Sequence, residues 1–174
     1  AEVLDRGALA AAAEAVGVAR RLLETTVAYV SERRQFGRAV GANQAVKHSC
    51  ADVAIAVEFA RPVVAMAAWS MAKGRSPTDG GTVSGDVSMA KALASDAVDR
   101  ACRSALQCHG AIGYTVEHDL QLWPKRGRAL SPTWGDAAPH RPRLASPPGL
   151  VRPGRRPHPR HRRAPNRRRH GHAG

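Results

Sequence analysis

The segment LAAAAEAVGVARRLLETTVAYVSERR, residues 9–34, decides the fold class. Its apolar residues recur at steps of three and four, which is the spacing of one face of an α-helix. Asp5 is a suitable cap for the start of this helix, and the glycines of residues 37–41 predict a turn after it. The sequence therefore predicts one long amphipathic helix near its start. The positions expected on its buried face are Leu9, Ala13, Val16, Ala19, Leu23, Val27 and Val30.

Two more segments repeat this spacing. A second helix is expected over residues 43–73, with Pro62 kinking it or interrupting it by one turn. A loop rich in glycine, serine and threonine, residues 74–85, precedes a third helix over residues 87–108. The core positions expected in these two helices are Val46, Val53, Val57, Val64, Met71, Met89, Leu93, Ala97, Ala101 and Leu106.

A shorter fourth helix is expected over residues 117–130, although Pro124 lies in its middle. Gly110 and Gly113 are typical of the end of the third helix. No stretch of the first 130 residues alternates with period two for long enough to form a sheet. The sequence therefore predicts an all-α domain over residues 1–130, most simply an antiparallel four-helix bundle.

Charge separates the last part of the chain from this domain. The net charge is +13, but residues 1–140 hold 16 Lys and Arg against all 14 Asp and Glu, so the body is almost neutral. Residues 131–174 contain nine of the 12 prolines and no apolar periodic face, so we expect a disordered basic tail. Its arginines would bind nucleic acid or other polyanions only non-specifically. Its composition also fits a shift of reading frame within GC-rich coding sequence.

Composition argues against several other classes of protein. No signal peptide is visible, and the longest charge-free apolar stretch, residues 63–72, is far shorter than the roughly 18 residues of a membrane span. Cys50, Cys102 and Cys108 form no CxxC pair, so neither a disulfide framework nor a zinc site is expected. We therefore expect a cytoplasmic protein with no membrane span and no bound metal.

Three short segments carry residues suited to a phosphate-bearing ligand. In ERRQFG, residues 32–37, two guanidinium groups adjoin an aromatic ring and a glycine turn. In GANQAVKH, residues 41–48, the free amides of a helix start favour anions. In QCHGAIGYT, residues 107–115, glycine permits a ligand to approach the backbone closely. Each also has an ordinary structural explanation: a basic helix end, a capped helix start and a glycine turn.

Taken in this order on an all-α frame, the three segments resemble the C-terminal domain of the acyl-CoA dehydrogenases. The family's Arg-x-x-Phe-Gly turn, the glutamine after it and the Gln-x-x-Gly turn have counterparts at the expected separations, as do residues 88–91 and Glu117. The resemblance covers about residues 1–130. It implies a four-helix bundle that builds the interface of a homo- or hetero-oligomer and shares FAD across that interface.

The resemblance also implies site residues. Arg33 matches the arginine that contacts the FAD diphosphate, and Gln35 and Phe36 match neighbours along the cofactor. Gln44 matches a second glutamine that contacts FAD. The family reaction removes an α proton from an acyl-CoA and passes a β hydride to the flavin. The turn that holds the adenosine-diphosphate end is matched by Gln107, His109, Gly110 and Ala111.

The catalytic base of the family has no acidic counterpart in this sequence. Its usual place falls at Trp134, or at Gly135 with one insertion, and the alternative place in the first helix matches Gly7. Asp136 lies just beyond, but its shorter side chain is a weak substitute. The family's N-terminal helical and middle β domains also have no counterpart. We therefore expect no catalysis by this polypeptide alone.

Three classes of function stay open at this point. The chain is a fragment or subunit of a larger flavoenzyme, a non-catalytic module for FAD binding or oligomerisation, or an unrelated helical protein with a polyanion-binding tail. Flavin absorbance in the purified protein separates the first two classes from the third.

Overall fold

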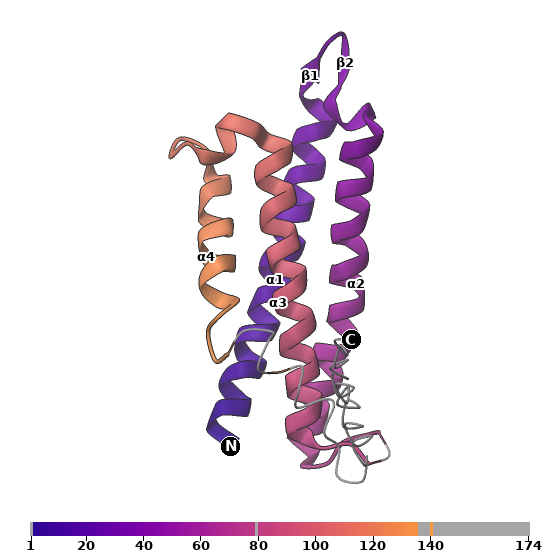
Figure 1. Cartoon of the computed structure of the whole chain (residues 1–174), viewed down its shortest axis with the longest axis vertical. Coiled ribbons are helices and arrows are strands. Elements are labelled where there is room, and N and C mark those ends of the chain that lie inside the picture. Colours follow the sequence, from indigo (N-terminus) through magenta and orange to yellow (C-terminus); the bar gives the residue numbers. More distant parts are fainter. Residues whose placement is uncertain (1, 79, 136–139, 141–174) are drawn as a thin grey trace, which may run out of the picture.

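A computed structural model describes residues 2–78, 80–135 and 140 of the chain. Four helices make up most of this part: α1 (Glu2–Glu32), α2 (Gln44–Lys73), α3 (Val83–His109) and α4 (Leu122–Leu130). Successive helices alternate in direction, and α3 lies between α2 and α4 in Figure 1. The predicted all-α, antiparallel four-helix bundle is confirmed. Most of the expected disordered tail, with all of its polyanion-binding arginines, falls on residues outside the described part. Its residues 131–135 and 140 are described, and Ser131, Trp134 and His140 among them contact the bundle.

Small residues let the helices approach one another closely. Ala12, Ala19, Ala60, Ala90 and Ala97 are fully buried where α1, α2 and α3 meet. The expected buried face of the first helix is partly wrong, because Ala13 and Val27 are exposed. Alanine and valine on a broader, rotated face of α1 take their place, since this helix packs against α2, α3 and α4.

The first helix begins earlier than its apolar period indicates. It starts at Glu2 rather than Leu9, so Asp5 lies inside the helix and is not its cap. The Asp5 side chain is 7% exposed, and its Oδ1 accepts a hydrogen bond of 3.1 Å from Ser84 Oγ. Asp5, which the sequence pattern placed at the start of the helix, is therefore buried against α3.

Neither proline interrupts its helix, and a cap sets the start of the third helix. The second helix is continuous through Pro62, so the expected interruption is wrong; Pro62 lies on its exposed side. The third helix starts at Val83, earlier than expected, because the Thr82 Oγ1 accepts a hydrogen bond of 3.0 Å from Gly85 N. In α4, Pro124 is the third residue, where its missing N–H leaves no helix bond unmade.

A small hairpin joins α1 to α2 and was not expected. Strands β1 (Arg34–Gln35) and β2 (Arg38–Ala39) pair antiparallel, followed by the 3₁₀ turn η1 (Val40–Ala42). Two further 3₁₀ turns, η2 (Gly110–Tyr114) and η3 (Asp119–Gln121), lead from α3 to α4. The hairpin and η2 therefore lie at the same end of the bundle, as Figure 1 shows.

A buried lysine ties the end of α4 to α3. Lys91 is 1% exposed, and its Nζ donates to Ser131 O at 2.6 Å, to Ser95 Oγ at 2.9 Å and to Leu130 O at 3.4 Å. These carbonyls belong to the end of α4, where helix carbonyls lack intrahelical partners. The contact fixes the point from which the chain turns back towards α1. None of the described helices has the length and apolar character needed to cross a membrane.

Candidate cofactor site

A cavity of about 640 Å³ opens at the end of the bundle that carries the hairpin and η2. Its volume lies in the range typical of small-molecule sites, which is on the order of 300–1,000 Å³. It is formed by the end of α1, the hairpin with η1, the start of α2, and the end of α3 with η2. The lining residues are Tyr29, Arg33, Gln35, Val40, Ala45, Val46, Ser49, Gln107, Cys108, His109, Gly110, Ala111 and Ile112.

Arg33 is held between α1 and the hairpin by its backbone. Its N–H donates to Tyr29 O at 2.9 Å, which continues the helical pattern, and its carbonyl accepts from Val40 N at 2.8 Å, next to the strand pair. None of the ion pairs among the described residues involves its side chain. Arg33 is suited to binding an anion. Its guanidinium takes part in no ion pair among the described residues, and its backbone is already ordered, so binding costs little conformational entropy.

The tip of the hairpin is strained and fully exposed. Phe36 and Gly37 both have positive φ, 51° and 79°, as the tight two-residue turn of a hairpin requires. Glycine adopts this conformation without cost, but for Phe36 it is unfavourable. The Phe36 side chain is 100% exposed and does not line the cavity. An aromatic ring is thus presented outward at the edge of the site.

His109 and Tyr29 form one wall of the cavity, and the His118 ring packs against both of them. The His109 ring stacks on Tyr29 at a centroid distance of 4.2 Å, and His118 lies edge-on at 5.4 Å. Its Nδ1 lies 2.8 Å from Ala105 O, so Nδ1 carries the hydrogen and donates. The Nε2 atom is buried and has no hydrogen-bond partner among the described residues.

The protonation state of His109 follows from its surroundings. Burial, and secondly the neighbouring His118, lower the pKa of His109 below its usual 6.5, although the bond to Ala105 opposes this. The ring is therefore neutral near neutral pH, and its Nε2 is a free acceptor. A buried acceptor without a partner is costly, about 1–3 kcal/mol, so a ligand group that donates a hydrogen bond would stabilise this wall.

The glycine turn after α3 leaves its backbone open. Gly110 has φ 62° and ψ −140°, and its N–H donates to Leu106 O to end the helix. A Cβ built on Gly110 would meet no atom within 4 Å, so space lies directly over the backbone. At Gly113, by contrast, a Cβ would lie 3.1 Å from His109 Cβ, so this glycine is needed for packing. Gly110 therefore leaves room for a ligand against the backbone, whereas Gly113 leaves room for the packing of His109.

The structure brings most of the predicted site residues together. Arg33, Gln35, Gln107, His109, Gly110 and Ala111 all line the cavity. Phe36 and Gln44 do not: Phe36 is at the hairpin tip, and Gln44 is the exposed first residue of α2. Tyr29 could not be predicted from the sequence, because its role depends on a ring stack with a residue 80 positions away. Cys108 and Ser49 also line the cavity and were not predicted.

The two positions expected to carry a catalytic base lie near the start of α1. A Cβ built on Gly7 would lie 2.8 Å from Trp134 Cζ2 and closer still to Cδ2 and Cε2. The indole of Trp134 therefore packs directly on the backbone of α1 at Gly7. Neither is acidic. Among the described residues, no group of three His, Cys, Asp or Glu side chains is placed to hold a metal ion.

Residues 1–145 match the family model described as "Acyl-CoA dehydrogenase, C-terminal domain". The chain is 40% identical over 124 residues to the acyl-CoA dehydrogenase IpdE2 of Mycobacterium tuberculosis, which covers 71% of this chain and 36% of that protein. The chain thus spans about a third of the length of the curated relatives it matches.

Solved structures give the same result. A chain of the ChsE4–ChsE5 complex from Mycobacterium tuberculosis superposes with a TM-score of 0.75 at 27% identity, over 82% of this chain and 37% of that one. A glutaryl-coenzyme A dehydrogenase in complex with glutaryl-CoA superposes with a TM-score of 0.72 at 31% identity, over 83% and 35%. The helical bundle, the cavity-lining turns and these matches agree: the chain belongs to the acyl-CoA dehydrogenase family and carries the C-terminal domain of that family.

Proposed function

We propose that this domain supplies part of an FAD site in an acyl-CoA dehydrogenase, and that the cavity beside Arg33 binds the diphosphate and adenosine end of the cofactor. The observation that carries the proposal is the convergence of Arg33, Gln107 and the open Gly110 backbone on one cavity from segments more than 70 residues apart. A guanidinium suits a diphosphate, and an amide side chain with exposed backbone suits the polar edge of a nucleotide.

The residues present fit such a group. The free Nε2 of His109 is an acceptor, and the hydroxyl and amino groups of an adenosine are donors. Arg33 and Gln35 lie on the hairpin side of the cavity, and Gln107, Gly110 and Ala111 lie on the side of α3. When bound, FAD supplies the hydride acceptor of the family reaction. The residues of this chain bind and orient it.

Phe36, which lies outside the cavity, has a separate place in this proposal. The exposed Phe36 ring at a strained tip is suited to reach into a neighbouring subunit, where we place the remainder of the cofactor. A solved relative is a complex of ChsE4 with ChsE5, which supports an assembly of subunits for this chain too. We propose a homo- or hetero-oligomer that shares FAD across an interface, in a cytoplasmic setting with which three free cysteines agree.

The complete enzyme, in this proposal, dehydrogenates an acyl-CoA between its α and β carbons. The present chain contributes no base to that step, since Gly7 and Trp134 occupy the two positions where one is expected. Proton abstraction needs a carboxylate within reach of the α carbon. We therefore propose that a partner subunit carries the base and that this chain is inactive alone. The domain boundary at residue 130 also stays a proposal.

The test is FAD binding to the full chain, measured by flavin fluorescence anisotropy with ADP as competitor. Arg33→Ala and Gln107→Ala should each weaken FAD binding, the first by at least about tenfold, because a charge-assisted hydrogen bond is worth about 1.5–3 kcal/mol. Arg61→Ala, an exposed arginine on α2 away from the cavity, is the matched control and should leave binding unchanged. Equal affinity of all three variants, or no competition by ADP, would exclude this cavity as the site.

A further inference from the structure

Two of the three cysteines lie at the end of the bundle that carries the cavity. Cys50 is in the second turn of α2, and Cys108 is the residue before the last of α3. Both side chains are half-buried, and neither is in a disulfide. Cys102 is buried on another side of α3, where its Sγ lies 3.9 Å from Pro124 O of α4. We call Cys50 and Cys108 the thiol pair.

The fold brings the thiol pair to one place between α2 and α3. Cys108 lines the proposed cofactor cavity together with Val46 and Ser49 of α2. Cys50 directly follows Ser49 and lies one helical turn after Val46, so it shares a face of α2 with Val46. Val46 and Cys50 also line a second cavity, of about 470 Å³, between α1 and α2. The thiol pair therefore lies around Val46, with one sulfur towards each cavity.

A hydrogen bond holds α2 against α3 at this level. Ser49 Oγ and Ser104 Oγ lie 2.7 Å apart, and we call them the serine pair. Ser49 is the neighbour of Cys50, and Ser104 lies one turn before Cys108 on the same face of α3. The serine pair therefore holds together the two helix segments that carry the thiols.

The thiol side chains are in contact with each other. Burial, then the charge of Cys108 and a hydrogen bond with its side chain, raise the pKa of Cys50 above its usual 9.0. A hydrogen bond forms only between neighbouring side chains, so it joins the thiols across the α2–α3 junction. The placement of the two helices and this contact therefore agree.

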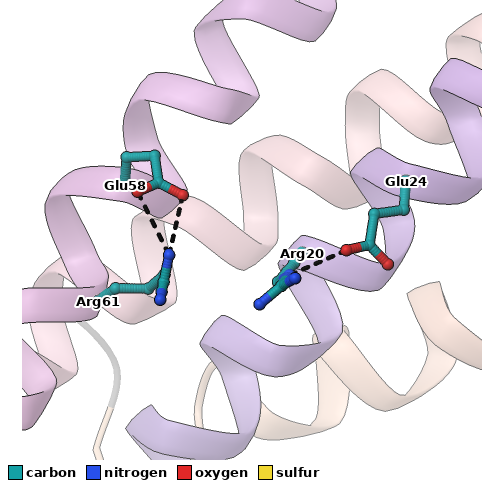
Figure 2. Close-up of polar contacts among 4 residues, drawn as sticks. All are labelled: Arg20, Glu24, Glu58 and Arg61. Atoms are coloured by element: carbon teal, nitrogen blue, oxygen red, sulfur yellow. Dashed lines mark hydrogen bonds and ion pairs between the residues drawn. The ribbon is translucent and has the colours of Figure 1, made fainter.

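Few side-chain bonds hold α2 to α3 at the cavity end. Figure 2 shows Glu58 paired with Arg61 on α2 and, separately, Arg20 paired with Glu24 on α1; each ion pair lies within one helix. Among the side-chain hydrogen bonds between described residues of α2 and α3, only the serine pair lies near the cavity. A covalent bond at the thiol pair would therefore add a strong link where the side chains now supply a weak one.

We propose that Cys50 and Cys108 are a reversible redox site, at which a small-molecule disulfide oxidises both thiols to one disulfide that links α2 to α3. Cys108 attacks first, because its side chain lines the cofactor cavity. Its thiolate displaces one thiolate from the small-molecule disulfide and leaves a mixed disulfide on Cys108. The Cys50 thiolate then attacks the Cys108 sulfur and displaces the second thiolate. The protons of the two cysteines pass to the released thiolates, so one disulfide is reduced as the other forms.

The new bond fixes two walls of the cofactor cavity relative to each other. Cys108 lies between Gln107 and His109 on the α3 wall, and Cys50 lies at the start of α2. The bond closes a loop of more than 50 residues, which restricts the unfolded chain and so stabilises the folded one. The inference goes beyond the proposed function and does not depend on it, because the thiol pair belongs to the bundle whether or not FAD binds.

The experiment is oxidation of the full chain with oxidised glutathione, followed by alkylation of the remaining thiols and non-reducing peptide mass spectrometry. We expect an intramolecular Cys50–Cys108 bond, and non-reducing electrophoresis should show no cross-linked dimer. Circular dichroism should find the melting temperature raised by at least about 5 °C, as closure of a long loop predicts. Dithiothreitol should return the melting temperature to its starting value.

Single substitutions identify the role of each thiol. Cys50→Ser and Cys108→Ser should each abolish the rise in melting temperature, and Cys50→Ser should accumulate the glutathione adduct on Cys108. Cys102→Ala is the matched control and should keep both the bond and the rise, since Cys102 faces α4. Absence of a Cys50–Cys108 bond in the oxidised wild type, a bond made through Cys102, or an unchanged melting temperature overturns the proposal. The first of these results needs no variant, so a variant that fails to fold does not obscure it.

Discussion

The indole of Trp134 lies on the backbone of Gly7, so that a single methyl group on Gly7 would overlap three of its ring atoms. The two residues are 127 positions apart, and they are the two positions at which the family's base is expected. Trp134 has φ 62°, and its carbonyl accepts from His140 Nε2 at 3.1 Å. His140 is itself 4% exposed, with Nδ1 3.2 Å from Ser88 Oγ. Trp134 therefore anchors the chain after α4 to α1, and His140 anchors it to α3 through Ser88.

This contact predicts that the effect of Gly7→Ala depends on Trp134. Alanine in a helix interior is favoured over glycine by about 0.8–1.0 kcal/mol. In the Trp134→Ala background, Gly7→Ala should therefore raise the free energy of unfolding by up to about 1 kcal/mol. In the wild type the overlap should reverse the sign, with a loss of about 1 kcal/mol. Urea denaturation of the four chains of this double-mutant cycle measures the difference; equal effects in both backgrounds would show that the contact is absent.

A second glycine tests how closely α4 packs on α3. A Cβ on Gly127 would lie 2.8 Å from both Cys102 Sγ and Val98 Cγ2, and these residues are buried. We expect Gly127→Ala to lower the free energy of unfolding by about 1–3 kcal/mol, as overpacking does.

The matched control for Gly127 is Gly17 on α1. A Cβ on Gly17 would meet nothing within 4 Å, so Gly17→Ala should stabilise the chain by about 0.5–1 kcal/mol. Thermal melts followed by circular dichroism compare the two variants. If both changes stabilise, α4 does not pack on α3 at the distance described.

The neutral state of His109 predicts a pH dependence of stability. Since burial lowers the pKa of His109 in the folded chain, the unfolded chain takes up a proton at this group first as pH falls below 6.5. The stability that His109 contributes is present above 6.5 and is lost as pH falls towards its folded pKa. Denaturation midpoints measured between about pH 7 and about pH 5 should thus fall more steeply for the wild type than for His109→Gln. Parallel slopes would mean that His109 takes up its proton as readily in the folded chain.

Cys102 and Cys108 should differ in reactivity. Burial, and secondly Asp99, raise the pKa of Cys102 to about 11 from its usual 9.0, so its thiolate is about a hundredfold scarcer than that of an ordinary thiol at about pH 8. Alkylation followed by peptide mass spectrometry should find Cys102 modified far more slowly than Cys108, which is only half-buried and serves as an internal control. Comparable rates in the folded chain would show that Cys102 is not buried between α3 and α4.

The helices could be predicted because their apolar period is a local property of the sequence. Their ends could not, since Asp5 is buried by Ser84 and the Val83 start depends on the Thr82 cap. The hairpin was missed because two residues per strand give no alternation to detect. Only Gly37 indicated the turn, because glycine suits the positive φ that both turn residues adopt, whereas Phe36 does not.

The candidate site was predicted only in part, because some of its residues lie in local motifs and others are brought there by contacts between helices. The Arg33 and Gln107 segments are recognisable as motifs, and the fold brings both to one cavity. Tyr29 and the unpartnered His109 Nε2 depend on a ring stack between α1 and α3 that no local pattern specifies. Likewise, the sequence places no acid at Gly7 or Trp134, but only the structure shows that these two residues touch.

The most direct test of the central claim is the anaerobic visible absorbance spectrum of the full chain, first mixed with FAD and then with short- and long-chain acyl-CoA. We predict that the oxidised-flavin band shifts when the chain is added and then keeps its intensity with either acyl-CoA, as the proposed partial cofactor site without a base requires. A band that does not shift would contradict the cofactor site, and bleaching by an acyl-CoA would contradict the absence of a base.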